Sequence, residues 1–293
     1  MSEFPSPTEP ATNEQSRIIQ LWQLFKITCI EWWNDDTFRL SASLAFYTIF
    51  SLTPVLLIAV GAAGVFVSQE TAAVQIEGEV QRMAGAEGAR AIRQMIEASN
   101  ELGSSRLPFA IGIMTFLIGA TAVFGELQAA LNRLWDVESD PKHGLIRRLI
   151  IDRARSFAIA LGVGFLLLVS LIFSAAISGL QAFLTTWMPS VPWLWQAANV
   201  VASFLVAALL FAMIYRFLPD VRLGYRDVWV GASATAVLFT CGKYLIGLYL
   251  GQTAISSAFG AAGSFVVLLI WVYYSALISF FGAEFTQVYA RRY

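Results

Sequence analysis

Residues 41–67 read SASLAFYTIFSLTPVLLIAVGAAGVFV, a run of 27 residues without a single aspartate, glutamate, lysine or arginine. About 20 apolar residues in an α-helix cross a hydrocarbon core roughly 30 Å thick. This run is therefore long enough to span a membrane, and five further runs share its character. The six predicted spans are about 41–67, 107–131, 157–180, 197–215, 228–250 and 263–285.

The composition of the whole chain supports the same conclusion. Hydrophobic residues make up 57% of the 293 residues and charged residues 13%, with a mean hydropathy of +0.65. Soluble domains carry about 25% charged residues, which they need to cover their surface. Two cysteines exclude a disulfide scaffold, and a net charge of -1 provides no basic field for nucleic acid. We predict an all-α, polytopic membrane protein.

The distribution of cations predicts how the spans are oriented. With the N-terminus inside, 14 of the 19 lysines and arginines fall in cytoplasmic segments, as the positive-inside rule requires. Both termini are therefore expected on the cytoplasmic side of the membrane. The outer loop at 68–106 shows helical periodicity on either side of Gly85–Gly88, which predicts a helical hairpin with a solvated charged face.

The chain before the first span divides into two parts. Residues 1–16 contain three prolines and no apolar stretch, so we expect a disordered tail rather than a signal peptide. Residues 17–36 carry apolar side chains, Trp22, Trp32 and Trp33 among them, at helical spacing. This pattern is typical of an amphipathic interfacial helix, and two interpretations stay open: it lies in the headgroup region, or it packs against the bundle. The membrane domain is then 37–293.

Lys243 is the one cation expected well inside the membrane. It lies roughly 22 Å along the fifth span, beyond the midplane, on a face that also carries Gly247 and Gly251. It either points into the bundle or extends to the outer headgroups. Pro54 removes a backbone hydrogen bond within the first span and predicts a kink. The candidate residues for a translocation path or cavity are Tyr47, Ser51, Pro54, Thr240 and Lys243.

Acidic residues near the predicted cytoplasmic boundary form a second group. Glu126 and Glu284 are both too far along the helix axis from the level of Lys243 to pair with it directly. We expect them to pair instead with arginines near the same boundary. The candidates for these ion pairs are Glu126, Glu284, Arg39, Arg133, Arg216 and Arg291. A structural belt of ion pairs is the favoured interpretation, and a gate is the alternative.

The sequence offers little for catalysis. His143 is the only histidine, and no CxxC, HxxxH, P-loop or GxSxG motif occurs. A hydrolase or nuclease needs a nucleophile with a base, or a set of metal ligands, in one place. We therefore predict no enzymatic activity, no cofactor and no metal site.

Several segments together carry a resemblance to a known family. They are SASLAFYTIFSLTPVLLI (41–58), LNRLWDV (131–137), YRFLPD (215–220), CGKYLIGLYLG (241–251) and FGAAGSFVVLLIWVYYSALISFFGAEF (259–285). From about residue 30 to its end the chain resembles the YihY/virulence factor BrkB family. The resemblance implies a bacterial inner-membrane protein with six spans; an old ribonuclease BN label of the family finds no support in the residues above. Phe259 departs from the family pattern, where tyrosine is expected.

The family is linked with serum resistance and with export of a lipid A precursor, so the resemblance implies envelope lipid handling. We expect a transporter or flippase-like protein for a lipid or other amphiphile. The alternative is a non-transporting structural or assembly factor of the envelope, and a ribonuclease is the least favoured. The expected partners are membrane lipid, anionic lipid included, and a second copy of the chain or another envelope protein. Nucleic acid is not expected.

Overall fold

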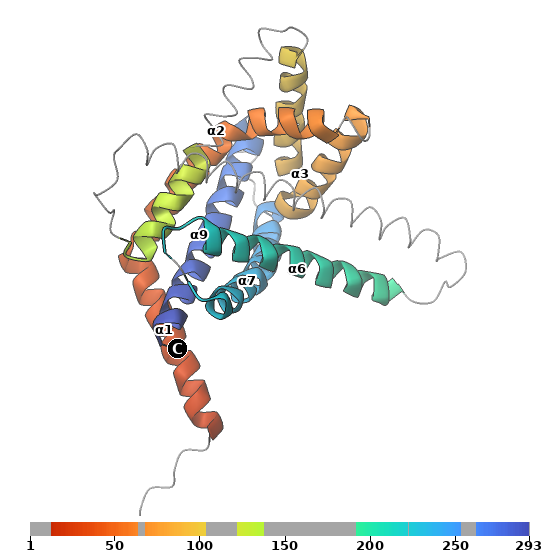
Figure 1. Ribbon diagram of the computed structural model, residues 1–293. Coiled ribbons are helices and arrows are strands. Elements are labelled where there is room, and N and C mark those ends of the chain that lie inside the picture. Colours follow the sequence, from red (N-terminus) through yellow and green to blue (C-terminus); the bar gives the residue numbers. More distant parts are fainter. Residues whose placement is uncertain are drawn as a thin grey trace, which may run out of the picture.

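The computed structural model describes residues 13–63, 68–103, 122–137, 192–221, 223–252 and 262–292 (Figure 1). Every regular element within these residues is a helix, which confirms the all-α prediction. The predicted span at 157–180, most of the predicted tail at 1–16 and the greater part of the span at 107–131 lie outside the described residues.

The first two helices are α1 (Asn13–Asn34) and α2 (Thr37–Ala63). Asp35 and Asp36 form the turn between them, and Asp36 has a φ of 55°, a left-handed conformation that aspartate tolerates better than most residues. The buried Thr37 hydroxyl donates to the Trp32 carbonyl across this turn. The turn is therefore fixed by its own hydrogen bonds, and it sets α1 at an angle to α2 (Figure 1).

α1 has two different faces. Leu24 and Thr28 are buried on the side that packs against α9, whereas Trp22 and Trp33 are 66% and 69% exposed. An exposed tryptophan has an apolar ring and a polar N–H, the combination that favours a membrane–water boundary. The helix thus combines a packed face with a free aromatic face.

α3 (Gln69–Gly103) is two helices joined at Gly85. Gly85 has φ 76° and ψ -176°, a conformation open almost only to glycine. Ser68 begins the helix by accepting a hydrogen bond from the Thr71 amide at 3.1 Å, as an N-cap does. The side chains of Ile92 and Ile96 are buried in one cluster with apolar residues of α2 and α9. The hairpin is therefore held to the bundle by an apolar contact.

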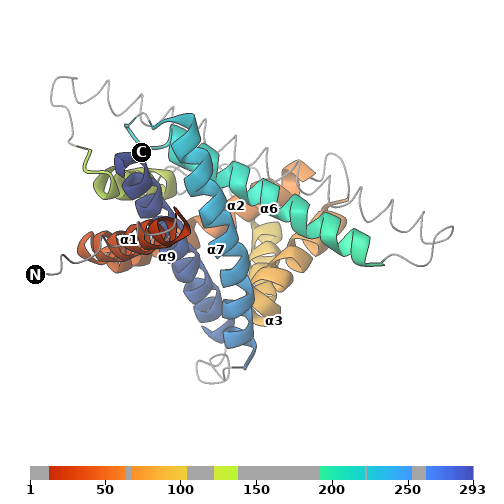
Figure 2. The same cartoon turned by 90° about the horizontal axis from the view of Figure 1, so that it is seen from below.

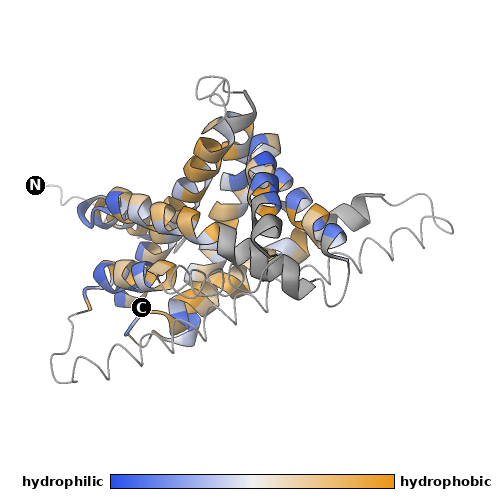
Figure 3. Ribbon diagram, turned by 90° about the horizontal axis from the view of Figure 1, so that it is seen from above, coloured by the Kyte–Doolittle hydropathy of each residue, from blue (hydrophilic) through white to orange (hydrophobic). Residues whose placement is uncertain are grey.

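Three stretches within the described residues are long and apolar enough to cross a membrane: Val200–Phe217, Tyr225–Ile246 and Gly263–Arg292. They belong to α6 (Pro192–Phe217), α7 (Tyr225–Gln252) and α9 (Gly263–Arg292) and coincide with the last three predicted spans. Large apolar side chains of α6 and α7 are more than a third exposed, among them Val200, Leu205, Leu245 and Leu248. Such surfaces are unfavourable in water and suit lipid. Figure 3 shows apolar residues along these helices and polar residues gathered on α3.

α9 lies at the centre of the bundle and packs against α1, α2, α3 and α7 (Figure 2). Its crossing with α7 is reciprocal: a Cβ on Gly231 would collide with Thr286, and a Cβ on Gly282 would collide with Thr235. Glycine opposite threonine allows the two backbones to approach closely, which is how helices associate in membranes. The crossing fixes α7 and α9 as one antiparallel pair.

Candidate functional site

A cavity of about 160 Å³ lies between α2, the helical segment 122–134, α6 and α9. The segments that line it are far apart in the sequence and meet only through the packing around α9. Most of its lining is aliphatic or aromatic. The lining residues are Leu44, Leu127, Leu131, Phe211, Ile214, Tyr215, Val272, Ser275, Ala276, Ser279 and Phe280.

Two of the three hydroxyl-bearing residues in this lining, Tyr215 and Ser279, donate their hydroxyl groups to carbonyls within the protein. The hydroxyl of Tyr215, which is almost fully buried, donates to the Ser279 carbonyl at 2.7 Å and lies 3.2 Å from the Thr235 hydroxyl oxygen. Ser279 donates its own hydroxyl to the Ser275 carbonyl at 2.8 Å. Because these two donors are already used, the lining is mainly apolar and offers few hydrogen bonds to a polar solute.

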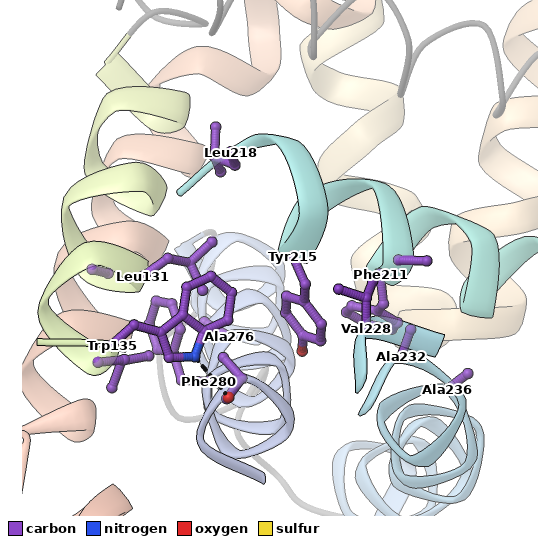
Figure 4. Close-up of a cluster of buried hydrophobic side chains, with 14 of the residues drawn as sticks. Leu131, Trp135, Phe211, Tyr215, Leu218, Val228, Ala232, Ala236, Ala276 and Phe280 are labelled. Atoms are coloured by element: carbon purple, nitrogen blue, oxygen red, sulfur yellow. Dashed lines mark hydrogen bonds between the residues drawn. The ribbon is translucent and has the colours of Figure 1, made fainter. Parts of the chain in front are cut away.

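Trp135 packs beside the cavity at one end. Its indole N–H donates to the Ala283 carbonyl at 3.0 Å, and its ring meets the Tyr215 ring edge to face with 6.1 Å between centroids. Figure 4 shows Trp135, Tyr215 and Phe280 converging from three different elements. The hydrogen bond ties the chain after the helical segment to α9 and fixes this wall of the cavity.

A polar clasp joins the helical segment to the end of α6. Asn132 donates its side-chain amide to the Asp220 carboxylate at 2.8 Å, and its amide oxygen accepts from the Asp220 backbone N–H at 2.9 Å. Gln128 adds two longer contacts to the same carboxylate, at 3.3 and 3.4 Å. Two-way hydrogen bonding of this kind fixes both the distance and the register of the two elements.

Ion pairs gather where α1, the end of α9 and residues 133–136 meet, a region called here the charged end. Arg39 and Arg133 both approach the Asp36 carboxylate, at 3.4 and 3.0 Å, and Arg291 approaches the Asp136 carboxylate at 2.7 Å. All of these side chains are at least 43% exposed. Each pair therefore contributes at most about 1 kcal/mol to stability. Their main effect is to align the helices that they join.

The arginines and glutamates predicted to form ion pairs have varied surroundings. Arg39, Arg133 and Arg291 do form ion pairs, but with Asp36 and Asp136. Arg216 donates to the Leu223 carbonyl and lies 4.4 Å above the Tyr225 ring centroid. Glu126 is half-buried, and neither it nor Arg216 is in an ion pair with another described residue.

Glu284 has the least ordinary position of the predicted group. Its side chain is fully buried, and neither carboxylate oxygen has a hydrogen-bond partner among the described residues. The acidic groups that act on it are Asp35, which comes within side-chain hydrogen-bonding reach, and then Glu31 and Asp136. No described arginine forms a salt bridge with it.

The described contacts of the residues predicted for a translocation path are local ones. Ser51 is buried and donates to the Thr48 carbonyl, whereas Tyr47 is 39% exposed against the Phe46 ring. Lys243 is half-exposed, with its Nζ 5.3 Å from the Tyr244 ring centroid, and it is not among the residues that line the cavity.

The other two predicted residues differ in how far they are described. Thr240 is half-exposed on α7, three residues before Lys243. Pro54 lies within α2, but its side chain is outside the described part of the structure. The predicted kink at Pro54 stays a prediction.

Several residues of the site were not singled out from the sequence. Tyr215, Trp135 and the Asn132–Asp220 clasp lie at the ends of predicted spans, where polar residues are ordinary. A usable signal existed in LNRLWDV and YRFLPD, since each places polar and aromatic residues within one helical turn of an apolar span. Within the described residues, no group of three or more histidine, cysteine, aspartate or glutamate side chains is arranged to hold a metal ion.

Within the described residues, a helical bundle with three helices long and apolar enough to cross a membrane is typical of an integral membrane protein. The sequence comparisons are more specific. A family model described as virulence factor BrkB matches residues 28–293, so the chain belongs to the BrkB family. No solved structure matches it.

Curated relatives carry the same kind of name. A UPF0761 membrane protein of Alteromonas mediterranea is 27% identical over 91% of this chain and 87% of the relative. One of Ralstonia nicotianae is 22% identical over 92% of this chain, and one of Alkalilimnicola ehrlichii is 24% identical over 88%. The chain spans 60% and 56% of the length of these last two relatives. None of the three names denotes an enzyme.

Proposed function

We propose that this protein is a transporter or flippase-like protein for a lipid or similar amphiphile of the bacterial envelope, and that its cavity receives an acyl chain. The single observation that carries the proposal is the apolar cavity itself, which is partly open and is lined by α2, the helical segment, α6 and α9. An apolar occupant fits best, because most of the lining is aliphatic or aromatic and Tyr215 and Ser279 donate their hydroxyl groups to other partners.

The energetics favour an occupied cavity. Empty space in a protein core costs about 24 cal/mol per Å³, so a dry cavity of 160 Å³ costs about 4 kcal/mol at most. A hydrocarbon chain recovers part of this cost through dispersion contacts, whereas water would find few hydrogen-bond partners there. The bilayer around the bundle supplies acyl chains at high concentration.

Lys243 then has a separate role from the cavity. Its ammonium group lies over the half-exposed side of α7, next to the Tyr244 ring, which is 60% exposed. An amine and an aromatic ring at this kind of surface favour contact with anionic headgroups. We assign Lys243 to the selection of anionic lipid, so that Lys243→Ala lowers the preference for anionic over neutral lipid while acyl capture in the cavity is retained.

The orientation follows the positive-inside bias. The charged end is proposed to face the cytoplasm of the inner membrane, with the α3 hairpin on the outer side. Single cysteines introduced at Asn34 and at Glu87 are expected to react with an impermeant maleimide from opposite sides of sealed vesicles. Reaction of both from the same side contradicts this orientation.

The experiment that tests the cavity uses a lipid with a photoactivatable acyl chain in reconstituted vesicles. Ala276→Phe places a ring in the cavity, and Ala129→Phe adds the same ring on the exposed face of the helical segment. Wild type and Ala129→Phe are expected to be labelled at cavity residues such as Phe211. Ala276→Phe is expected to lose this label, keep label on the outer faces of α6 and α7, and lose translocation of a fluorescent lipid. Unchanged cavity labelling in Ala276→Phe contradicts the proposal.

A second candidate, the non-transporting assembly factor, is favoured by the outward face of α3. Arg90 pairs with Glu87, and Arg93 pairs with Glu77 and Glu97, on a hairpin that is anchored to the bundle by its other face. This face of α3 is therefore a charged surface on an anchored hairpin, which suits binding of a protein partner. Arg90→Glu with Arg93→Glu is expected to abolish capture of that partner without lowering thermal stability, and normal lipid translocation in this variant separates the two functions.

A further inference from the structure

Glu284 is an ionisable residue that neither water nor a cation of the described residues stabilises in its charged form. Glu284 lies one turn beyond the cavity wall, roughly 32 Å along α9 from Gly263, at the charged end of the bundle. Its exposed fraction is 0%, and a water-sized probe reaches neither carboxylate oxygen. Neither oxygen has a well-formed hydrogen bond with a described residue, and the side chain that comes within hydrogen-bonding reach is another acid, Asp35.

A carboxylate in this environment is very unfavourable. An unpaired ion transferred from water to a protein interior costs so much that the group takes up a proton instead. The neighbouring charges add to this cost rather than relieve it, because they are acidic: Asp35 in the α1–α2 turn, Glu31 on α1, and Asp136 after the helical segment. Like charges beside a buried carboxyl favour its neutral form.

Cations near the charged end are engaged by other acids. Arg39 and Arg133 bind the Asp36 carboxylate, and Arg291 binds Asp136. On the opposite side of Glu284, α9 packs on α7 through uncharged residues, glycine against threonine. No positive charge from a described element therefore faces Glu284 directly.

We propose that Glu284 is a proton-binding site, at which this protein takes up and releases one proton between α9 and the α1–α2 turn. The enclosure of the carboxyl selects the ligand, since there is no space for a hydrated cation but a proton needs none. Release of the proton leaves a carboxylate, which needs hydrogen-bond donors to stabilise it. Unpaired donors are present on the same two helices: the Trp32 indole N–H on α1, whose ring lies 6.0 Å from that of Phe281, and the Gln287 amide on α9.

This site is independent of the proposed lipid function, because proton binding requires only the buried carboxyl and its neighbours. Its consequence is a dependence of the α1–α9 contact on pH. Glu284 is neutral when it is enclosed and ionised when it is exposed to water, so enclosure takes up a proton. The contact is therefore expected to weaken as the pH rises.

The test is infrared difference spectroscopy on the full chain in lipid, which detects the carbonyl stretch of a protonated carboxylic acid. At neutral pH wild type is expected to show this band, sensitive to isotopic labelling of glutamate and bleached by alkaline titration. Glu284→Gln, which has the shape of the protonated side chain, is expected to fold and to lose the band. Glu126→Gln, a matched change at a half-buried glutamate, is expected to keep it. A wild-type protein without the band, or a Glu284→Gln protein that keeps it, overturns the proposal.

Two further variants keep the test decisive if Glu284→Gln folds poorly. Asp35→Asn removes the closest neighbouring acid and is expected to move the alkaline loss of the band to lower pH. Asp36→Asn changes the adjacent residue, whose charge is already neutralised by Arg39 and Arg133, and is expected to move it much less. Equal effects of the two variants contradict the assignment of the proton to Glu284.

Discussion

The crossing of α7 and α9 gives the most quantitative prediction. In Gly282→Ala the new methyl group collides with the side chain of Thr235, which is itself fully buried and held by a hydrogen bond to the Gly231 carbonyl. Threonine cannot move aside without breaking that bond, so the backbones must separate. Overpacking of a close-packed core typically costs about 1–3 kcal/mol.

The same substitution also has a favourable effect. Alanine is better than glycine in a helix by about 0.5–1 kcal/mol. Gly282→Ala is therefore expected to destabilise the protein by about 1–2 kcal/mol in total. Gly78→Ala and Gly125→Ala are matched controls, because a Cβ at either position meets nothing within 4 Å. These controls should be neutral or should stabilise by up to about 1 kcal/mol.

The assay is thermal unfolding of purified protein in detergent, followed by the fluorescence of its tryptophans. Gly282→Ala should lower the midpoint by several degrees, at about 2–4 °C per kcal/mol for a chain of this size. Adding Thr235→Gly should recover part of the loss, since the two residues are in contact and their effects are not additive. A midpoint for Gly282→Ala equal to those of Gly78→Ala and Gly125→Ala would refute the proposed role of this crossing.

Three other predictions concern the contacts around the cavity and α1. Trp135→Phe keeps the ring but removes the indole N–H that donates to α9, so it should cost about 1 kcal/mol in the same assay, whereas no change in midpoint contradicts the bond. Asn132→Ala removes both hydrogen bonds of the clasp to Asp220 and should cost more, about 1–3 kcal/mol, with increased proteolysis of the loop after α6 as an independent readout. Burial raises the pKa of the Cys29 thiol above its ordinary value of 9.0, so less of it is thiolate at a given pH. In a Cys241→Ser protein, maleimide should therefore label Cys29 more slowly at neutral pH than it labels free cysteine, and equal rates contradict the packing of α1.

The sequence could predict those features that depend on local composition. The runs at 197–215, 228–250 and 263–285 are apolar enough to be helices whatever they pack against, and they became α6, α7 and α9. The glycine at position 85 could be singled out as a break because a left-handed residue between two amphipathic patterns is nearly always glycine. Such signals require no knowledge of tertiary contacts.

Features that depend on contacts between distant residues could not be predicted. The Asn132–Asp220 clasp joins residues 88 positions apart, and neither residue differs from an ordinary polar residue at the end of a span. Asp36 and Asp136, which pair with the arginines, both lie at turns after helices and have positive φ, of 55° and 51°. Position along the helix predicted only that Glu284 lies near the end of the last span, whereas its burial results from the packing of α1 on α9.

The position of Glu284 on α9 determines which part of the bundle responds to its proton. Gly282 and Thr286 lie on either side of it and are locked against α7 by the reciprocal crossing. A rise in pH therefore cannot easily separate α9 from α7. The opposite side of Glu284 faces α1 and the turn that follows it, where the contact depends on the buried Glu284 carboxyl and on exposed ion pairs, each of which contributes little to stability.

Distances between spin labels measure this asymmetry directly. A label at Gln23 of α1 paired with one at Arg292 of α9 should show a longer or broader distance distribution at alkaline pH, because an ionised Glu284 favours hydration of the α1–α9 contact. A label at Leu238 of α7 paired with the same Arg292 label should show no change, since the glycine–threonine crossing contains no titrating group. The three labelled positions, Gln23, Leu238 and Arg292, are all exposed, so the labels themselves do not disturb packing. If the distances of both pairs change, the whole bundle responds to pH and the response is not specific to the α1–α9 contact at Glu284. If neither distance changes, the proton on Glu284 does not control the position of α1.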